Sequence, residues 1–468
     1  MNKIYRVVIF VLLILIIGNE WAKVLRPETS IFDGRNETTN ITKQGFDDLP
    51  KDSLDYLVLG SSNVFMNINP IEIMEKYNYY GYDYATPVQP IYLSEYYLKD
   101  ALKTQSPRVV ILDALGIGFY EDSSEEYTHL SLDYMDLDKE KIEAISYIPY
   151  DKEEYYFDFM KYHSRWESLF KDDLDSLEYN DKENFLGYVP AYTTAGVTEG
   201  DFLESGEEVA ISSKVKDSFA RITKICENNG IKLVVIKTPR IGWTEQMSLA
   251  TNELCLEYDV DYYDFNMIVD ELELDINGDF CDGGSHLNEV GANKVSDYLG
   301  NIVSSYIGVH DNKKGNIVTY YNKRCEAYNH FKEYNSLVST VDVKEYFSKA
   351  AELSDYIYVC GDLYENEAFS SFVNEYIGKK LDKRFFIIGT ADNNNFVLED
   401  DKEIVFEDNK FFIRVADSDE GVVSEMQFKY QNYGKGQAIN IFTYDSYYDE
   451  IIDSAYIVPD ETGFEIWR

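Results

Sequence analysis

The chain has 468 residues, of which 45% are hydrophobic and 15% aromatic. This length suits roughly two to three domains, and this composition excludes both a single small module and a wholly disordered chain. With 43 Lys and Arg against 85 Asp and Glu, the formal net charge is −42. Such a field repels phosphate backbones and excludes unaided nucleic-acid binding. The acidity itself indicates either a solvated surface or an attraction for cations.

The five cysteines are odd in number, widely spaced and free of any C-x-x-C pair. This pattern indicates neither a disulfide framework nor a zinc site. We therefore expect no metal and no other cofactor.

The amino terminus carries an apolar run, Val7–Gly18, that follows Lys3 and Arg6. Positive charge before such a run favours a cytoplasmic amino end and an extracytoplasmic body, and no small-residue cleavage site follows it. We therefore predict a single-pass signal anchor, a transmembrane helix over residues 1–24, with a buried first strand as the alternative. Residues 25–50 are polar without an apolar period, which predicts a linker.

From Asp55 onward, short β-branched runs alternate with helical patterns. This alternation predicts an α/β domain over residues 51–307, with a mostly parallel sheet covered by helices on both faces. Ligands of such sheets bind at the carboxyl ends of the strands. The predicted strands are Tyr56–Leu59, Val109–Leu112, Leu233–Ile236 and Tyr262–Phe265, and the predicted helices are Pro70–Tyr77, Leu93–Thr104, Val215–Asn228, one from Thr244 to about Tyr258, and Asn288–Ile307.

Two loops at these strand ends carry the residue types of nucleophilic ester chemistry. Ser62 lies in the GSSN turn after the first strand, and Asp282 and His286 lie in the CDGGSHLN loop before the last helix. In such a set, histidine removes the serine proton and the carboxylate fixes the imidazole tautomer. We predict Ser62 as nucleophile, His286 as base and Asp282 as the orienting carboxylate. A helix-capping turn and a polar loop are the alternative.

Three segments, LVLGSSNVFMNINP, VVIKTPRIGW and DFCDGGSHLNEVGANKVSDYLG, resemble the first, middle and last blocks of the SGNH/GDSL-type hydrolases. The resemblance covers residues 51 to about 306. It is greatest to membrane-anchored bacterial members related to the teichoic acid D-alanyl transfer protein and the alginate O-acetylation proteins. It implies a flavodoxin-like, three-layer α/β/α domain and a Ser-His-Asp triad acting on acyl esters of a glycan. The implied partners are a cell-surface glycan or teichoic-type polymer and a membrane-bound O-acyltransferase.

The sequence departs from this family at three points. The nucleophile block reads GSS instead of GDS, and the last block has one residue more than usual between acid and base, so Asp279 is an alternative carboxylate to Asp282. The glycine and asparagine that usually complete the oxyanion hole have no clear counterpart. Beside the N–H of the nucleophile itself, the candidate donors are Gln89 and Gly116.

Further residues are predicted to contact the substrate. Arg165, in the segment KYHSRW, has a planar fork suited to a carboxylate or phosphate of the polymer, with an ion pair to a nearby acid as the alternative. Trp243 is a candidate for stacking on a sugar ring, with half-buried packing as the alternative. The other candidates for substrate binding are His163, Arg240 and Asn288.

The last third of the chain predicts a connector over residues 308–339 and a smaller, mixed α/β domain over residues 340–468. The segments LSDYIYVCGDLYENEAF, FFIIG and AINIFTYDSYYDEIIDSAYIV distantly resemble the lectin-like domain of the interleukin-like epithelial-mesenchymal inducer family. This resemblance implies glycan binding, and a scaffold or docking domain is the alternative. The predicted helices are Val343–Leu353 and Glu365–Ile377, and the predicted strands are Tyr356–Val359, Phe385–Ile388, Phe411–Val415 and Ile439–Phe442.

Together these features predict an extracytoplasmic, membrane-anchored SGNH-type esterase or O-acyltransferase that acts on a cell-surface polymer without metal. The alternative from another class is a non-catalytic glycan-binding or scaffold component of a polymer-modification complex, in which the triad is vestigial. A missing carboxylate contact to His286 would favour that alternative.

Overall fold

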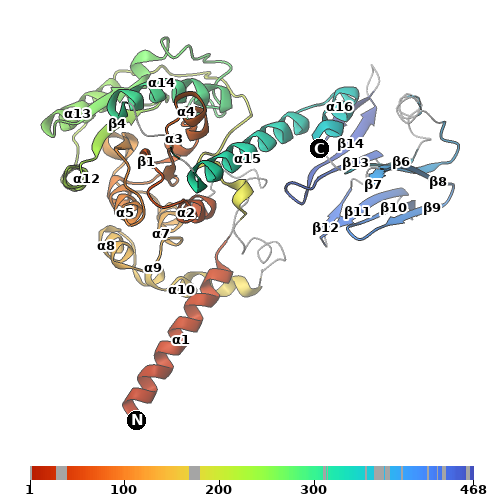
Figure 1. The fold of residues 1–468 in the computed structure, drawn as a ribbon, viewed down its shortest axis with the longest axis horizontal. Helices are drawn as coiled ribbons and strands as arrows, with labels where there is room; N and C mark the ends of the chain where they lie inside the picture. The colour runs from red at the N-terminus through yellow and green to blue at the C-terminus, as the bar shows by residue number, and fades with distance from the viewer. Residues whose placement is uncertain are drawn as a thin grey trace. The chain divides into compact units, whose positions relative to one another are not determined.

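The chain divides into two compact units, Met1–Tyr328 and Asn329–Arg468, in the computed structural model (Figure 1). The division falls inside the helix α15 (Asn316–Val338), within the stretch that the sequence analysis assigns to a connector. The structure describes residues 3–27, 39–167, 180–308, 313, 315–353, 356–362, 371, 374, 380–391, 394–418, 421–429, 431–434, 439–459 and 464–468.

The first unit is built on a five-stranded, all-parallel sheet in the order β2-β1-β3-β4-β5. This is the order of flavodoxin-like, doubly wound sheets. The α/β class predicted for this region is therefore confirmed. The three-residue strand β2 was not predicted, because so short a segment has no readable period. The strands are β1 (Tyr56–Gly60), β2 (Asp83–Ala85), β3 (Val109–Asp113), β4 (Lys232–Lys237) and β5 (Asp261–Asp264).

Helices cover both faces of this sheet (Figure 1). On one face α4 (Pro70–Tyr77) packs with α14 (Glu289–Ile307), and on the other α5 (Ile91–Ala101) packs with α12 (Ser213–Asn229). This covering is required because β1 and β3 are buried along their whole length. The sequence therefore gives the central strands continuous apolar runs and places polar residues at their ends.

The first unit has further described helices. They are α1 (Lys3–Leu25), α2 (Thr39–Asp47), α3 (Ser62–Phe65), α6 (Leu115–Gly118), α7 (Glu125–Leu132), α8 (Lys139–Tyr147), α9 (Glu153–Tyr156), α10 (Asp158–Tyr162) and α13 (Glu245–Glu257), with 3₁₀ turns at His163–Glu167, Asp181–Glu183 and Phe265–Ile268.

The predicted membrane anchor receives no support. Its residues form the helix α1, so the alternative of a buried first strand is wrong. Among the residues that the structure describes, no helix has both the length and the apolar character needed to cross a membrane.

Part of the predicted linker is folded. Thr39–Asp47 forms α2, and most of its side chains are buried. Phe46 stacks on Tyr84 with ring centroids 4.0 Å apart, and the Tyr82 hydroxyl donates to the Thr42 carbonyl at 2.8 Å. The linker prediction is wrong for this helix. The segment is mostly polar, but a few apolar side chains such as Phe46 pack it against the rest of the unit. Residues 28–38 lie outside the described residues.

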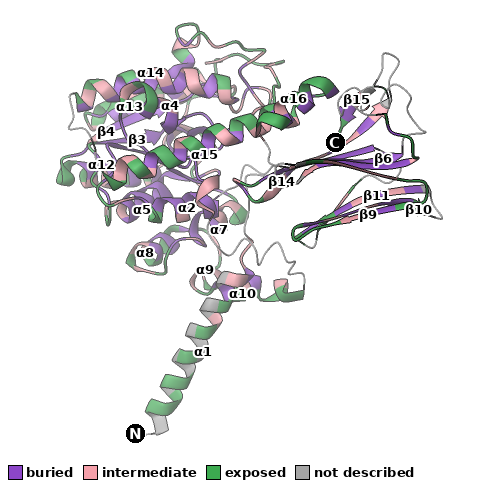
Figure 2. Cartoon of the chain, turned by 45° about the vertical axis from the view of Figure 1, so that its right-hand side comes forward, coloured by how far each residue is buried: buried purple, intermediate pink, exposed green. Residues whose placement is uncertain are grey.

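The second unit differs from the predicted mixed α/β domain, because its described strands form two antiparallel sheets. The orders are β15-β14-β13-β6-β7-β8 and β12-β11-β10-β9. Both sheets contribute to one buried core that includes Phe385, Phe411, Ile413 and Phe442, so they pack face to face (Figure 2).

The sequence analysis found only four of these strands. It missed the short polar strand β12, and it missed β8, whose apolar residues Phe396, Val397 and Leu398 are consecutive and do not alternate with polar ones. Most of the predicted helix Glu365–Ile377 lies outside the described residues. The elements are α16 (Val343–Leu353), β6 (Tyr356–Asp362), β7 (Phe385–Ala391), β8 (Asn394–Asp400), β9 (Glu403–Glu407), β10 (Phe411–Ser418), β11 (Gly421–Phe428), β12 (Gln431–Tyr433), β13 (Ile439–Asp445), β14 (Glu450–Pro459) and β15 (Phe464–Trp467).

Candidate active site

Ser62 lies at the carboxyl end of β1, where the strand passes into α3. Gly60 has a φ of 152°, and a Cβ there would lie 2.3 Å from the Asp113 Cβ, so this turn beside β3 requires glycine. Ser61 caps α3, because its Oγ accepts the Asn63 N–H at 3.3 Å. The same hydroxyl donates to the Asp113 carboxylate at 2.6 Å. The Ser61 hydroxyl therefore fixes the turn to β3 and to α3. Ser62, the next residue, is partly exposed.

Asp282 and His286 lie in a loop that is closed at its base. Phe280 and Leu287, both fully buried, form an antiparallel bridge across it. Asp282 Oδ1 accepts the N–H groups of Ser285 at 3.0 Å and His286 at 2.8 Å. The two glycines of this loop have φ values of 82° and 114°, which lets the chain turn tightly. The loop thus accommodates the additional residue between acid and base.

The two loops meet in a continuous hydrogen-bonded relay. Ser62 Oγ lies 2.8 Å from His286 Nε2, and His286 Nδ1 lies 2.6 Å from Asp282 Oδ2. A carboxylate can only accept, so it favours the tautomer with the proton on Nδ1 and the lone pair of Nε2 toward Ser62. The structure thus brings together the three residues that the sequence singled out. This arrangement is suited to removing the hydroxyl proton during attack on an acyl carbon.

The carboxylate in contact with His286 belongs to Asp282 and not to Asp279. Partial burial would raise the pKa of Asp282, but hydrogen bonds from the His286 ring and from the loop backbone lower that pKa below its ordinary value. Asp279 instead accepts the Lys294 ammonium at 2.7 Å and the Asp275 N–H at 2.8 Å. Asp282 therefore remains ionised beside the imidazole, while Asp279 braces the base of the loop.

Two asparagines that the sequence analysis missed tie the histidine loop to the serine turn. Asn63 Nδ2 donates to the Ser285 carbonyl at 3.0 Å, and the Leu287 N–H donates to Asn67 Oδ1 at 2.9 Å. These contacts hold the residues on both sides of His286. The SSNVFMN segment contains the signal, because residues four apart in a helical turn lie on one side of it.

Two buried residues at the end of β4, Lys237 and Thr238, support the asparagines. Lys237 is fully buried, and its Nζ donates to Asn63 Oδ1 at 3.0 Å and to the Thr238 carbonyl at 2.6 Å. Burial lowers the pKa of Lys237 to about 8. Asn67 Nδ2 donates to Thr238 Oγ1 at 3.0 Å. The carboxyl end of β4 therefore positions the relay without contributing a residue to it.

Of the two predicted oxyanion donors, Gln89 has other partners. Gln89 is buried, its Nε2 donates to Thr86 Oγ1 at 3.0 Å, and its Oε1 accepts from the Ser94 hydroxyl at 2.8 Å. Gly116 packs against the backbone of Ile91, where a Cβ would lie 3.0 Å from the nitrogen. The Gln89 side chain is thus engaged away from the relay, and a role for the Gly116 N–H stays a prediction.

Two predicted substrate contacts are structural instead. Trp243 is fully buried and its Nε1 donates to Asp264 at 2.9 Å, so its ring cannot stack on a sugar. Asn288 is buried and caps α14, because its Oδ1 accepts the N–H groups of Val290 at 3.1 Å and Gly291 at 3.2 Å. In both cases a side chain that could bind a ligand instead makes hydrogen bonds within the protein.

The residues of the KYHSRW segment contact helices at the amino-terminal end of the first unit. Arg165 donates to the Leu25 carbonyl at 2.6 Å, at the end of α1. His163 is exposed, and its Nδ1 lies 2.8 Å from the Met160 carbonyl. The structure therefore brings neither side chain into contact with the relay.

Arg240 lies in a loop that adjoins the histidine loop. The next residue, Ile241, donates its N–H to the Gly284 carbonyl at 2.9 Å. The Arg240 guanidinium lies over the Phe119 ring, 5.3 Å from its centroid, and the Arg240 N–H donates to Asn266 Oδ1 at 2.8 Å. Arg240 therefore lies in a loop that borders the histidine loop of the relay.

In the described part of the chain, no group of three or more His, Cys, Asp or Glu side chains is placed to hold a metal ion. No family model matches the sequence, and no curated protein matches it. One similar solved structure is a candidate acylhydrolase from Bacteroides fragilis, with 11% identity and a TM-score of 0.28 over 57% of this chain and 95% of that one. A similarity this low supports no argument about function.

Proposed function

We propose that this protein is a serine esterase or O-acyltransferase whose nucleophile is Ser62. The observation that carries the proposal is the relay from Ser62 Oγ through His286 to Asp282, with contacts of 2.8 Å and 2.6 Å. The sequence analysis made a missing carboxylate contact the mark of a vestigial site. Because Asp282 makes that contact, the enzyme is favoured over the non-catalytic glycan-binding or scaffold component.

The proposed reaction proceeds through an acyl-enzyme. Ser62 Oγ attacks the acyl carbonyl carbon while its proton passes to His286 Nε2, and Asp282 stabilises the imidazolium. His286 then gives this proton to the leaving alkoxide as the ester C–O bond breaks, and the acyl group stays on Ser62. Water or a second hydroxyl attacks the acyl-enzyme and passes its proton to His286, which returns it to Ser62 Oγ as the bond between Oγ and the acyl carbon breaks. The products are a free acid or a new ester, and a regenerated Ser62.

We extend the proposal to acyl esters on a cell-surface polysaccharide or teichoic-type polymer, on the strength of the sequence resemblance. The same resemblance supports a membrane-bound O-acyltransferase as a partner that supplies acyl groups. Arg240 supports an anionic substrate, because its planar guanidinium lies in a loop beside the relay. Glycan binding by the second unit remains a prediction.

We also propose that α1 associates with a membrane. Large apolar side chains on this helix are strongly exposed, among them Phe10 at 63%, Ile17 at 56% and Trp21 at 59%. Flotation of the full chain with phospholipid vesicles tests this part. We expect co-flotation that is lost when Phe10 and Ile17 are changed to serine, and a wild-type chain that stays with the soluble fraction would contradict it.

Covalent labelling with a fluorophosphonate probe tests the proposed nucleophile. We expect the full chain to be labelled, and we expect Ser62→Ala and His286→Ala to lose labelling while keeping their circular dichroism spectra. Ser285→Ala is the matched control, because it removes another serine hydroxyl from the histidine loop and should keep the wild-type rate. Undiminished labelling of Ser62→Ala, or no labelling of the folded wild type, would overturn the proposal.

A further inference from the structure

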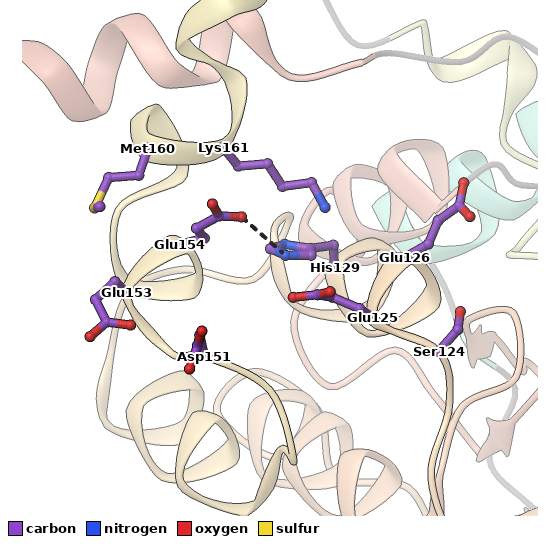
Figure 3. Close-up of a pocket in the computed structure, with 9 residues that line it drawn as sticks. All are labelled: Ser124, Glu125, Glu126, His129, Asp151, Glu153, Glu154, Met160 and Lys161. Carbon is purple, nitrogen blue, oxygen red and sulfur yellow. Dashed lines mark ion pairs between the residues drawn. The ribbon is translucent and has the colours of Figure 1, made fainter.

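We infer that the first unit holds a second ligand site, outside the relay, which binds an organic ammonium group. The site is a cavity of about 900 Å³ lined by residues of α7, α9, α10 and the loops beside them (Figure 3). None of its lining residues belongs to the relay. Its carboxylates are Glu125, Glu126, Asp151, Glu153 and Glu154.

The first argument is uncompensated charge. Five carboxylates and one lysine, Lys161, line the cavity, which gives the lining a formal charge of −4. Glu154 lies 4.0 Å from His129 Nε2, which is beyond hydrogen-bond distance and is no ion pair with a neutral imidazole. The other four carboxylates form no ion pair with any residue that the structure describes. The cavity therefore attracts positive charge that the protein itself does not supply.

The second argument is a buried acceptor without a donor. His129 is only 2% exposed, and its ring stacks on Tyr155 at 3.9 Å. Its Nδ1 lies 3.0 Å from the Asp133 carboxylate, which can only accept, so the favoured tautomer carries its lone pair on Nε2. Among the residues that the structure describes, this Nε2 has no hydrogen-bond partner. Figure 3 shows the imidazole among Glu154, Glu125 and Lys161, at the cavity wall. Buried acceptors of this kind are nearly always satisfied.

These two features select the ligand chemistry. A protonated primary or secondary amine supplies both the positive charge for the carboxylates and an N–H donor for His129 Nε2. A quaternary ammonium supplies only the charge. A bare metal ion is disfavoured, because no described group of three ligating side chains is placed to hold one. The volume suits a group as large as an amino sugar, carried either by a free small molecule or by a polymer.

Titration calorimetry of the full chain with glucosamine tests the inference. We expect glucosamine to bind, N-acetylglucosamine not to bind because it lacks the charge, and choline to bind about tenfold or more weakly because it lacks the N–H donor. A chitosan oligomer that binds more tightly than glucosamine assigns the site to a polymer, and equal or weaker binding assigns it to a small amine. No binding of glucosamine, or equal binding of choline, would overturn the inference.

Variants make the test specific to this cavity. His129→Asn keeps a donor to Asp133 and removes the Nε2 acceptor, so glucosamine affinity should fall about tenfold. Glu154→Gln and Glu125→Gln alter exposed or partly exposed side chains and should each weaken binding severalfold without unfolding the protein. Glu227→Gln, an exposed change on α12, is the matched control. Cavity variants that bind glucosamine like this control would overturn the inference. Ser62→Ala should bind it like the wild type, which separates this test from that of the proposed esterase.

Discussion

Asp279 and Asp282 lie three residues apart in one loop and have different partners. We predict that Asp282→Asn slows fluorophosphonate labelling roughly 10³–10⁴-fold, because an amide no longer holds the required imidazole tautomer. Asp279→Asn should keep the wild-type labelling rate and lose about 1–3 kcal/mol of stability, because it weakens the contact with Lys294. Labelling rates and urea unfolding of both variants measure this, and equal losses of labelling would contradict the assignment.

Burial of Lys237 makes the free energy of unfolding depend on pH, and it fixes the sign of that dependence. Its pKa falls from an ordinary value of 10.5 to about 8 in the folded protein. Between these two values the unfolded chain binds more protons, so the free energy of unfolding rises with pH in this window. The buried Lys237 ammonium destabilises the folded protein by its full amount below about pH 8, and this destabilisation disappears above about pH 10.5.

We therefore predict that the wild type gains stability relative to Lys237→Met as pH rises through this window. The gain should reach at most about 1.4 kcal/mol for each pH unit. Urea unfolding of both proteins at about pH 7, 9 and 10 measures the difference. The comparison with the variant removes the contribution of other titrating groups. A difference that does not change with pH would show that Lys237 titrates normally.

At the scale of elements, α2 shows how a polar segment becomes part of the core. Phe46 is 2% exposed and stacks on Tyr84. We predict that Phe46→Ala costs about 3–5 kcal/mol of unfolding free energy. Asp48→Ala, an exposed change just after the helix, should stay within about 0.5 kcal/mol of the wild type. Urea unfolding monitored by circular dichroism gives both values, and similar costs would mean that α2 is not docked.

Elements of the first unit could be predicted where their own residues contain a clear signal for a strand or a helix. β1 and β3 are continuous apolar runs, and α12 ends at Gly230 in the left-handed region. The strands of the second unit were less predictable. The strand β12 has only three residues, none of them fully buried, and pairs only because β11 presents its edge. Such a strand takes its stability from its neighbour, and its own sequence has no clear period.

At the scale of the whole molecule, the two units have separate cores and should unfold separately. Ile413 is fully buried in the core between the two sheets of the second unit. We predict two calorimetric transitions. Ile413→Ala should shift only one of them to lower temperature, with a loss of about 2–5 kcal/mol in the unfolding free energy of that unit. Fluorophosphonate labelling of this variant should match the wild type below both transitions. A single transition that shifts as a whole would contradict independent units.

The sequence by itself determined the α/β class of the first unit and singled out Ser62 and His286 as candidates, whereas the choice of Asp282 over Asp279 came from the structure. It could do so because apolar runs, caps and a serine turn are local patterns, each readable within a few residues. Only the tertiary structure decided which side chains are free for chemistry. Trp243 and Asn288 were plausible ligand contacts in the sequence, yet burial of one and the capping role of the other commit both to the fold.

The tertiary structure also decided what the relay rests on. Asn63, Asn67 and Lys237 come from two strand ends that lie far apart in the chain, and they meet only because β1 and β4 end at the same edge of one parallel sheet. The cavity around His129 has the same origin. Its acceptor is left without a partner by the packing of α7 against Tyr155, and no local pattern of the sequence encodes that packing. Contacts between distant segments depend on burial and geometry, which a sequence read a few residues at a time does not contain.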